Sequence, residues 1–368
     1  MRTPLLVRRG AAAALTPLVA AVVLTGCASS SDNSRSGQPS STSSASGPGE
    51  RTSIGNVTTV ASGLDAPWSI AFDGDVALIS ERDSGRIVEL KAGGLSREVG
   101  KIEGVAPMGE GGLLGIAVHD DHLYAYYTAE EENRLERFEL NGEPGSLSLG
   151  EPQTLLDGIP SAGNHNGGRI AFGPDGMLYV TVGDAGNRSA AQDRGSLAGT
   201  ILRLTPDGDV PADNPFDSSP VYSYGHRNPQ GLAWDEDGTM YSTEFGQDTW
   251  DELNVIEPGR NYGWPTVEGI AQDGRFTNPV QQWNPADASP SGMAIAGGSI
   301  WIANLRGERL REVPLGDTSS STEYLSGERG RLRDVAVAPD GSLWVLTNNT
   351  DGRGDPDPGD DRVLRIEP

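Results

Sequence analysis

The stretch Ile170-Ala-Phe-Gly-Pro-Asp-Gly-Met-Leu-Tyr-Val-Thr-Val182 decides the fold. Two short apolar runs flank a Gly-Pro-Asp-Gly turn, a pattern that is typical of an antiparallel β-hairpin. The same rhythm returns along the chain, and we count six copies of one unit. The copies begin at Ile70, Ile116, Ile170, Leu232, Met293 and Val335.

Each copy continues into a second strand of β-branched and aromatic residues and then into a third strand that returns. The starts lie roughly 40 to 60 residues apart, which is the spacing of propeller blades rather than of solenoid coils. We therefore predict an all-β fold, a six-bladed β-propeller of four-stranded antiparallel blades. We expect the leftover run at residues 57–60 to complete the last blade near Ile366 and close the ring. A β-sandwich is the alternative, but it does not explain the sixfold recurrence.

The composition agrees with such a fold. The 368 residues include 50 Gly and 25 Pro, and 36% of them are hydrophobic. This favours short strands joined by turns over long helices. The formal net charge of -24, with no basic face in the sequence, argues against nucleic acid as a partner.

The first residues have the pattern of a targeting segment. Arginines at positions 2, 8 and 9 precede an apolar run at residues 11–24, which is too short for a stable membrane span but suits a signal peptide. The run ends in Leu24-Thr-Gly-Cys27, which has the lipobox pattern of bacterial lipoproteins. We predict that Cys27, the only cysteine, is lipidated and that no disulfide forms.

The predicted domain boundaries follow from this pattern. Residues 1–27 form the lipoprotein signal peptide, which ends at the lipidated cysteine. Residues 28–53 are rich in Ser and cannot bury enough apolar surface to order the chain, so we expect a disordered linker. Residues 54–368 form the propeller domain. We expect the protein to be extracytoplasmic and lipid-anchored to the bacterial cell membrane.

His165 is the predicted catalytic base. It lies in Gly163-Asn-His-Asn-Gly-Gly-Arg169, directly before the strand that opens at Ile170. Small neighbours leave an imidazole accessible on a rigid scaffold, and its ordinary pKa suits it to accept a hydroxyl proton at neutral pH. The alternative is a turn histidine that only bonds a neighbouring loop.

Other unusual polar residues also lie in segments next to predicted core strands. In a propeller such segments converge over the central channel, so distant parts of the sequence can meet around one ligand. The segments are residues 110–114, 164–165, 225–230, 244–247, 304–306 and 331–334.

Several of these motifs occur together in one order. They are Gly109-Glu-Gly-Gly-Leu-Leu-Gly115, His165-Asn-Gly-Gly-Arg169, Tyr224-Gly-His-Arg-Asn-Pro-Gln-Gly231, Asp251-Glu-Leu-Asn254, Asn261-Tyr-Gly-Trp-Pro265 and Arg331-Leu-Arg-Asp334. Across residues 57–368 the chain resembles the soluble PQQ-dependent aldose sugar dehydrogenases of the glucose/sorbosone dehydrogenase family. The resemblance implies a propeller that holds pyrroloquinoline quinone (PQQ) over its axis, with Ca²⁺ beneath the quinone.

The resemblance also implies the reaction. His165 takes the proton from the anomeric hydroxyl of an aldose while hydride passes to the quinone, and a lactone results. A cofactor is needed because no protein side chain accepts hydride. An external electron acceptor then reoxidises the cofactor.

PQQ carries three carboxylates, so this acidic chain must gather cations locally to hold it. Guanidinium groups suit the task because they meet carboxylates bidentately and stay charged. By resemblance, the cofactor-binding residues are Arg227, Asn228, Arg306, Arg331 and Arg333. The alternative for each arginine is an ordinary surface ion pair.

The remaining site residues are also implied by the resemblance. Backbone carbonyls of Gly246 and Gln247 bind the cofactor's Ca²⁺, which prefers oxygen ligands. A second, structural Ca²⁺ matches Asp251, Glu252 and Tyr262. Glu110 and Asn164 would face the sugar; they differ in polarity from residues in some relatives, so the preferred sugar does not transfer.

Two other functions stay open at this point. A calcium-dependent lactonase can use the same fold, but it needs side-chain carboxylates at the metal rather than paired arginines. A propeller that only binds a partner is not excluded by fold. A nicotinamide-binding Gly-x-Gly-x-x-Gly between a strand and a helix is missing, as is a Gly-x-Ser-x-Gly elbow. The oligomeric state is left open.

Overall fold

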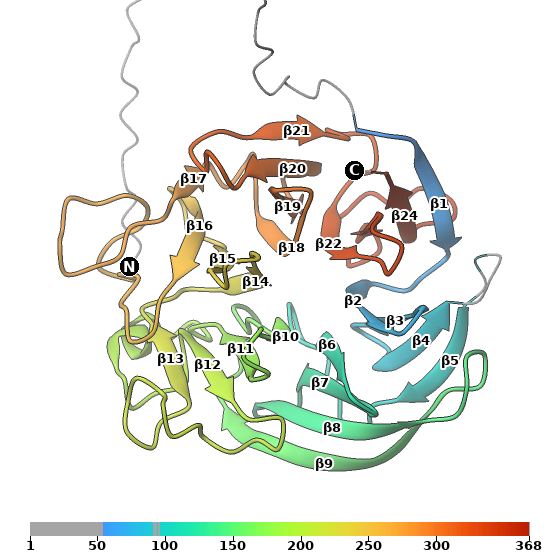
Figure 1. Cartoon of the computed structure of the whole chain (residues 1–368), viewed down its shortest axis with the longest axis horizontal. Coiled ribbons are helices and arrows are strands. Elements are labelled where there is room, and N and C mark those ends of the chain that lie inside the picture. The colour runs from blue at the N-terminus through green and yellow to red at the C-terminus, as the bar shows by residue number, and fades with distance from the viewer. Residues whose placement is uncertain (1–53, 91–93, 95, 368) are drawn as a thin grey trace, which may run out of the picture. The chain divides into compact units, whose positions relative to one another are not determined.

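The computed structural model describes residues 54–90, 94 and 96–367 (Figure 1). The predicted signal peptide, Cys27 and the predicted linker lie outside the described residues. Within the described residues, no helix has the length and apolar character needed to cross a membrane.

Six four-stranded antiparallel sheets stand around a common centre (Figure 1). This confirms the predicted all-β propeller with six blades. The first three blades are β2 (Pro67–Asp73), β3 (Val76–Glu81), β4 (Arg86–Leu90), β5 (Ser96–Lys101); β6 (Leu113–His119), β7 (His122–Thr128), β8 (Asn133–Asn141), β9 (Ser148–Ile159); and β10 (Ile170–Phe172), β11 (Leu178–Val182), β12 (Thr200–Leu204), β13 (Val221–Tyr224). The other three are β14 (Pro229–Trp234), β15 (Met240–Glu244), β16 (Asp251–Ile256), β17 (Gln281–Trp283); β18 (Pro290–Ala296), β19 (Ser299–Asn304), β20 (Arg309–Pro314), β21 (Thr322–Tyr324); and β22 (Leu332–Val337), β23 (Leu343–Thr347), β24 (Arg362–Ile366), β1 (Val57–Ser62). A short 3₁₀ helix, η1 (Arg188–Gln192), lies between β11 and β12.

The ring is closed by strands from the two ends of the described chain. β1 pairs antiparallel with β24, and Val57 lies opposite Ile366. The prediction for the leftover N-terminal run is therefore confirmed. The outer edge of the last blade is thus covered by β1, which lies far from its partner β24 in the sequence.

The innermost strands begin earlier than the sequence indicated. In five blades the strand starts three residues before the predicted position, for example at Pro67 rather than Ile70 and at Leu332 rather than Val335. Pairing with the second strand shifts register within these first residues in all five blades. A bulge interrupts the two-residue alternation, so the apolar pattern starts only after it. As one consequence, Arg333 lies within β22 and not in a loop.

The outermost strands were the least visible in the sequence. β9 is mostly exposed, and β5 buries only Val99 fully. A strand with few buried positions shows little apolar alternation, so its sequence resembles a loop. The inner strands differ because neighbouring blades pack on both of their faces, as in the cluster of Leu114, Tyr124, Val180 and Leu202. Each such buried side chain stabilises the fold by about 1.5–3 kcal/mol.

Candidate active site

A cavity of about 250 Å³ lies where loops from five blades meet. In an up-and-down blade, the start of the innermost strand and the loop between the second and third strands lie at the same end. Apart from Asp251, the first residue of β16, the lining residues come from these two kinds of loop, which explains why they converge. They are Glu110, His165, Arg227, Asn228, Phe245, Gly246, Gln247, Asp251, Pro285, Ser289, Leu305, Arg306, Arg331 and Arg353.

The cavity brings together most of the residues predicted for the site. Asn164, Arg333, Glu252 and Tyr262 are not among the residues that line it. Asn164 is exposed beside His165, whereas the other three are buried. Arg353 lines the cavity but was not predicted as a site residue.

The backbone around His165 is held in an unusual conformation. His165 has φ of 57°, in the left-handed region, where a residue with a side chain needs support from its surroundings. Its N–H donates to Glu110 Oε2 at 3.0 Å. A Cβ at Gly183 would lie 1.9 Å from the His165 carbonyl oxygen, so only glycine fits there. The loop therefore presents His165 in one fixed position.

The imidazole of His165 has a carboxylate partner that the sequence analysis missed. Its Nδ1 lies 2.7 Å from Asp184 Oδ1, while Nε2 has no partner among the residues that the structure describes. With the proton on Nδ1, Nε2 is a free acceptor. The side chain is 13% exposed at the cavity, whereas that of Asp184 is fully buried. The pair therefore has the geometry of an oriented general base.

Asp184 is held ionised by its surroundings. Burial would raise its pKa, but hydrogen bonds from His165, Gly186 and Trp264 outweigh burial and hold the pKa below its usual value. The Trp264 Nε1–H donates to Asp184 Oδ2 at 2.8 Å. Asp184 directly follows Gly183 at the end of β11; this polar residue after a buried strand was the only signal in the sequence.

Three buried donors at the cavity lack partners among the described residues. They are Arg227 Nε, Asn228 Nδ2 and Arg331 Nε. A buried donor without an acceptor is costly, so such groups point to a ligand that supplies acceptors. Burial also lowers the pKa of Arg227, despite nearby carboxylates that raise it. These donors, with exposed Arg306 at the same cavity, suit an anion that carries several carboxylates.

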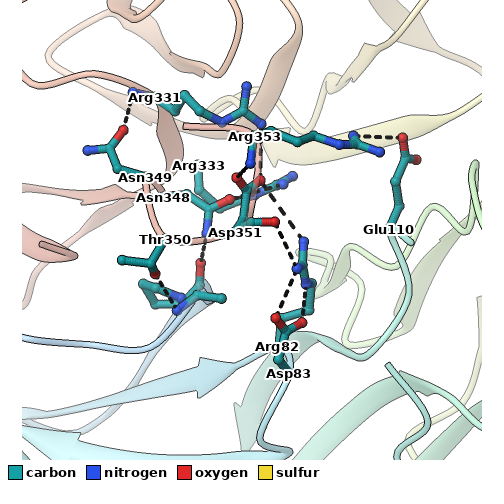
Figure 2. A network of polar contacts seen from close by, with 12 residues as sticks. Arg82, Asp83, Glu110, Arg331, Arg333, Asn348, Asn349, Thr350, Asp351 and Arg353 are labelled. Carbon is teal, nitrogen blue, oxygen red and sulfur yellow. Dashed lines mark hydrogen bonds and ion pairs between the residues drawn. The ribbon is translucent and has the colours of Figure 1, made fainter. Parts of the chain in front are cut away.

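Arg331 belongs to a network of polar contacts that also includes Asp351 and Arg82 (Figure 2). Its Nη2 donates to Asp351 Oδ2 at 3.1 Å, and the Arg82 Nη2–H donates to the Asp351 carbonyl oxygen at 3.3 Å. Arg333 lies fully buried nearby and donates to Gln230 Oε1 at 2.9 Å. Burial lowers the pKa of Arg333 to about 9. Since its donors are engaged by the protein, Arg333 supports the site from behind the cavity wall.

The residues predicted for Ca²⁺ fall into two places. Gly246, Gln247 and Asp251 line the cavity. Burial raises the pKa of Asp251 to about 6, even though N–H groups of Ser289 and Gly246 donate to it. A buried carboxylate of this kind gains from a nearby cation, so this part of the cavity fits a divalent ion.

Glu252 and Tyr262 lie apart from the cavity. Burial, with Glu244 nearby, raises the pKa of Glu252. The ring of Tyr262 stacks on His226 with 4.6 Å between ring centroids. Within residues 54–90, 94 and 96–367, no group of three or more His, Cys, Asp or Glu side chains is placed to hold a metal ion. The second Ca²⁺ stays a prediction.

A second histidine–carboxylate pair lies behind Arg227. His226 Nδ1 is 2.8 Å from Glu244 Oε2, and its Nε2 is 2.9 Å from the Ser223 hydroxyl. Glu244 Oε1 also accepts the N–H of Arg227. The side chain of His226 is completely buried. Both ring nitrogens are engaged, so this histidine fixes the backbone of Arg227 and has no free acceptor for a substrate.

Sequence and structure comparisons show which known proteins this chain resembles. Residues 64–355 match the family model described as Glucose / Sorbosone dehydrogenase. Aldose sugar dehydrogenase YliI of Escherichia coli is 31% identical over 347 residues, which cover 81% of this chain and 91% of the relative. The solved PQQ-bound form of aldose sugar dehydrogenase from Streptomyces coelicolor is 51% identical with a TM-score of 0.82, and the match covers 85% of this chain and 98% of that one.

Proposed function

The chain belongs to the glucose/sorbosone dehydrogenase family, and from that membership we propose that it oxidises the anomeric hydroxyl of aldose sugars to lactones with PQQ as cofactor. One observation carries the proposal. His165, with Nε2 free, lines the same cavity as Arg227, Asn228 and Arg331, whose buried donors lack partners among the described residues. A base and an anion-binding wall thus share one space.

The cofactor would be held by the donors of Arg227, Asn228 and Arg331, with Arg306 at the exposed side. PQQ, when bound, supplies the acceptor for the hydride that leaves the anomeric carbon. Arg333 contributes indirectly, because it fixes Gln230 and the wall from which Arg331 projects. No Arg side chain needs to leave its present partner for this role.

The proton is the task of His165. Its Nε2 accepts the proton of the anomeric hydroxyl as the C–H bond breaks. The imidazolium that forms is stabilised by ionised Asp184, which also keeps the first proton on Nδ1. Trp264 keeps Asp184 in place through its indole N–H. Proton removal and hydride departure together convert the hemiacetal into a lactone.

Ca²⁺ would bind beside the cofactor at Gly246 and Gln247, whose carbonyls are hard oxygen ligands. The carboxylate of Asp251 adds negative charge at the same wall. A sugar would meet Glu110 and, at the exposed rim, Asn164. Electrons would leave to an external acceptor.

Location is a separate proposal that rests on the sequence. The lipobox at Cys27 and the Ser-rich segment after it support a lipid-anchored enzyme outside the cytoplasmic membrane. Expression with labelled fatty acid in a bacterial host tests this. The label should be incorporated by the wild type and lost in Cys27→Ala; a labelled Cys27→Ala protein would contradict the proposal.

Reconstitution tests the activity. Purified protein is dialysed against a chelator, loaded with PQQ and Ca²⁺, and assayed for aldose-dependent reduction of a dye. We expect activity only when both are added. Hydrolysis of sugar lactones by the Ca²⁺-loaded protein without PQQ would instead support the lactonase. Failure to take up PQQ, measured by absorbance after gel filtration, would contradict the proposal.

A further inference from the structure

An ion pair joins two loops at the cavity that are far apart in the sequence. The Arg353 Nη1–H donates to Glu110 Oε1 at 2.9 Å across 243 positions of the chain (Figure 2). Glu110 precedes β6 of the second blade, and Arg353 follows β23 of the last blade. Both residues line the cavity. We call this pair the Glu110–Arg353 clasp.

The clasp reaches the predicted base through a single carboxylate. Glu110 uses one oxygen for Arg353 and the other for the main-chain N–H of His165. His165 is the residue held at φ of 57°. A carboxylate accepts at both oxygens, whereas an amide in its place offers one oxygen and turns an N–H₂ group toward a donor. Only an ionised carboxylate therefore satisfies both partners.

The far end of the clasp is anchored as well. The N–H of Arg353 donates to Asp351 Oδ1 at 2.9 Å, while Asp351 Oδ2 accepts from Arg331 at 3.1 Å. The loop is fastened further by Asp361, whose carboxylate accepts from the N–H of Thr350 at 3.1 Å. The carboxylate of Asp351 thus binds both the main chain of Arg353 and the side chain of Arg331, which lines the cavity.

The clasp is accessible to water, and this limits its contribution to the stability of the whole fold. The Arg353 side chain is 53% exposed and that of Glu110 is 23% exposed. Ion pairs this accessible to water contribute little to global stability. Burial would raise the pKa of Glu110, but the His165 N–H and Arg353 outweigh it, so the carboxylate stays ionised. The clasp therefore affects the geometry of the loop around His165 more than the free energy of unfolding.

We propose that Arg353 is a positioning residue for the oxidation: through Glu110 it holds the main chain of His165 so that the imidazole keeps its place at the cavity. This inference rests on the proposed function for its kinetic consequence. Its structural consequence does not depend on any bound group. Loss of Arg353 should loosen residues 163–167 while the propeller stays folded.

Hydrogen exchange of the protein without cofactor gives the first test. In Arg353→Met the arm keeps its apolar length but loses its charge, and Glu110→Gln keeps the shape of the acceptor. Amide exchange at His165 should be at least roughly threefold faster in both variants, because a charge-assisted hydrogen bond is weakened. Arg365→Met is the matched control; it removes ion pairs to Asp340 and Glu367 in the same blade, away from the cavity.

Kinetics of the loaded enzyme gives the second test. We expect kcat to fall roughly 3- to 10-fold in Arg353→Met, with KM for the sugar nearly unchanged and the urea midpoint as in the wild type. Arg353→Lys should recover part of kcat. The double variant Arg353→Met/Glu110→Gln should have a kcat no lower than that of the less active single variant, because both substitutions break the same ion pair.

The outcomes that overturn the inference are distinct. Wild-type exchange at His165 in Arg353→Met would show that the clasp does not hold the base. A raised KM with unchanged kcat, or additive losses in the double variant, would place Arg353 on the sugar rather than on Glu110. A wild type that takes up PQQ but oxidises no aldose would contradict the proposed function alone, and the exchange result would still decide the clasp.

Discussion

The two histidine–carboxylate pairs of this propeller look alike in distance and differ in what surrounds them. His165 lies 2.7 Å from Asp184, and His226 lies 2.8 Å from Glu244. His165 keeps Nε2 free of partners among the described residues and reaches the cavity. His226 is fully buried and gives Nε2 to Ser223.

The difference shows that pairing with a carboxylate does not by itself make a base. A catalytic imidazole also needs a free nitrogen that a substrate can reach. The pair of His226 and Glu244 satisfies the requirement that buried polar groups be hydrogen-bonded, and Glu244 also accepts the N–H of Arg227. In the proposed function, the pair of His165 and Asp184 would serve proton transfer, and the pair of His226 and Glu244 would support Arg227, which would hold the cofactor.

The largest expected effect comes from breaking the pair of His165 and Asp184 at the cavity. His165→Gln should lower kcat by roughly 10³-fold, about 4 kcal/mol of transition-state stabilisation, because the free imidazole nitrogen that would accept the hydroxyl proton is lost. PQQ uptake, measured by absorbance, should stay close to that of the wild type. Turnover close to the wild type would show that His165 is not the base.

Breaking the buried pair should affect stability instead. His226→Ala leaves Glu244 and Ser223 without their partner and removes the stacking on Tyr262, so we expect a loss of about 3 kcal/mol. Urea unfolding at neutral pH measures this loss. His226→Asn is the matched variant, since its amide can still donate to Glu244 and should lose less. The comparison fails if His226→Ala loses turnover but keeps the wild-type urea midpoint.

A smaller effect is expected from Trp264→Phe, which removes one donor to Asp184 and keeps a smaller aromatic ring. Asp184 has a lowered pKa in the folded protein, so its contribution to stability is present above the unfolded value of about 4 and is lost as pH falls further. The variant should be less stable by about 1 kcal/mol at neutral pH. That gap should narrow below about pH 4. A gap that is constant with pH would mean that Asp184 is not involved.

The blades could be predicted because their signal is local. Alternating apolar residues and Asp-Gly turns lie within a dozen positions of each other, and the closing strand at Val57 could be recognised by its β-branched residues, Val57-Thr-Thr-Val60. The bulges at the start of the inner strands broke that alternation and hid their first residues. The exposed outer strands were hidden because water on one side removes the need for apolar positions.

The partners of the site residues could not be predicted in the same way. Asp184 and Trp264 meet across 80 positions, and Glu110 and Arg353 across 243. Which loops touch depends on how far each reaches over the ring, and no periodicity in the sequence records that reach. Motif resemblance indicated His165, Arg227 and Arg331, which the structure brings to one cavity, but it gave no signal for a carboxylate beside the imidazole of His165.

The closure of the ring by β1 and β24 sets an order of events during translation. β1, the first of the described strands to leave the ribosome, has no partner until β24 has been made. The same final blade supplies Arg331 and Arg353. A nascent chain that has not reached this blade therefore lacks both the strand that closes the ring and one wall of the cavity. A polypeptide that stops before Arg331 would therefore leave β1 without β24 and lack both cavity arginines, so we expect it to be open to proteolysis and unable to hold the proposed cofactor.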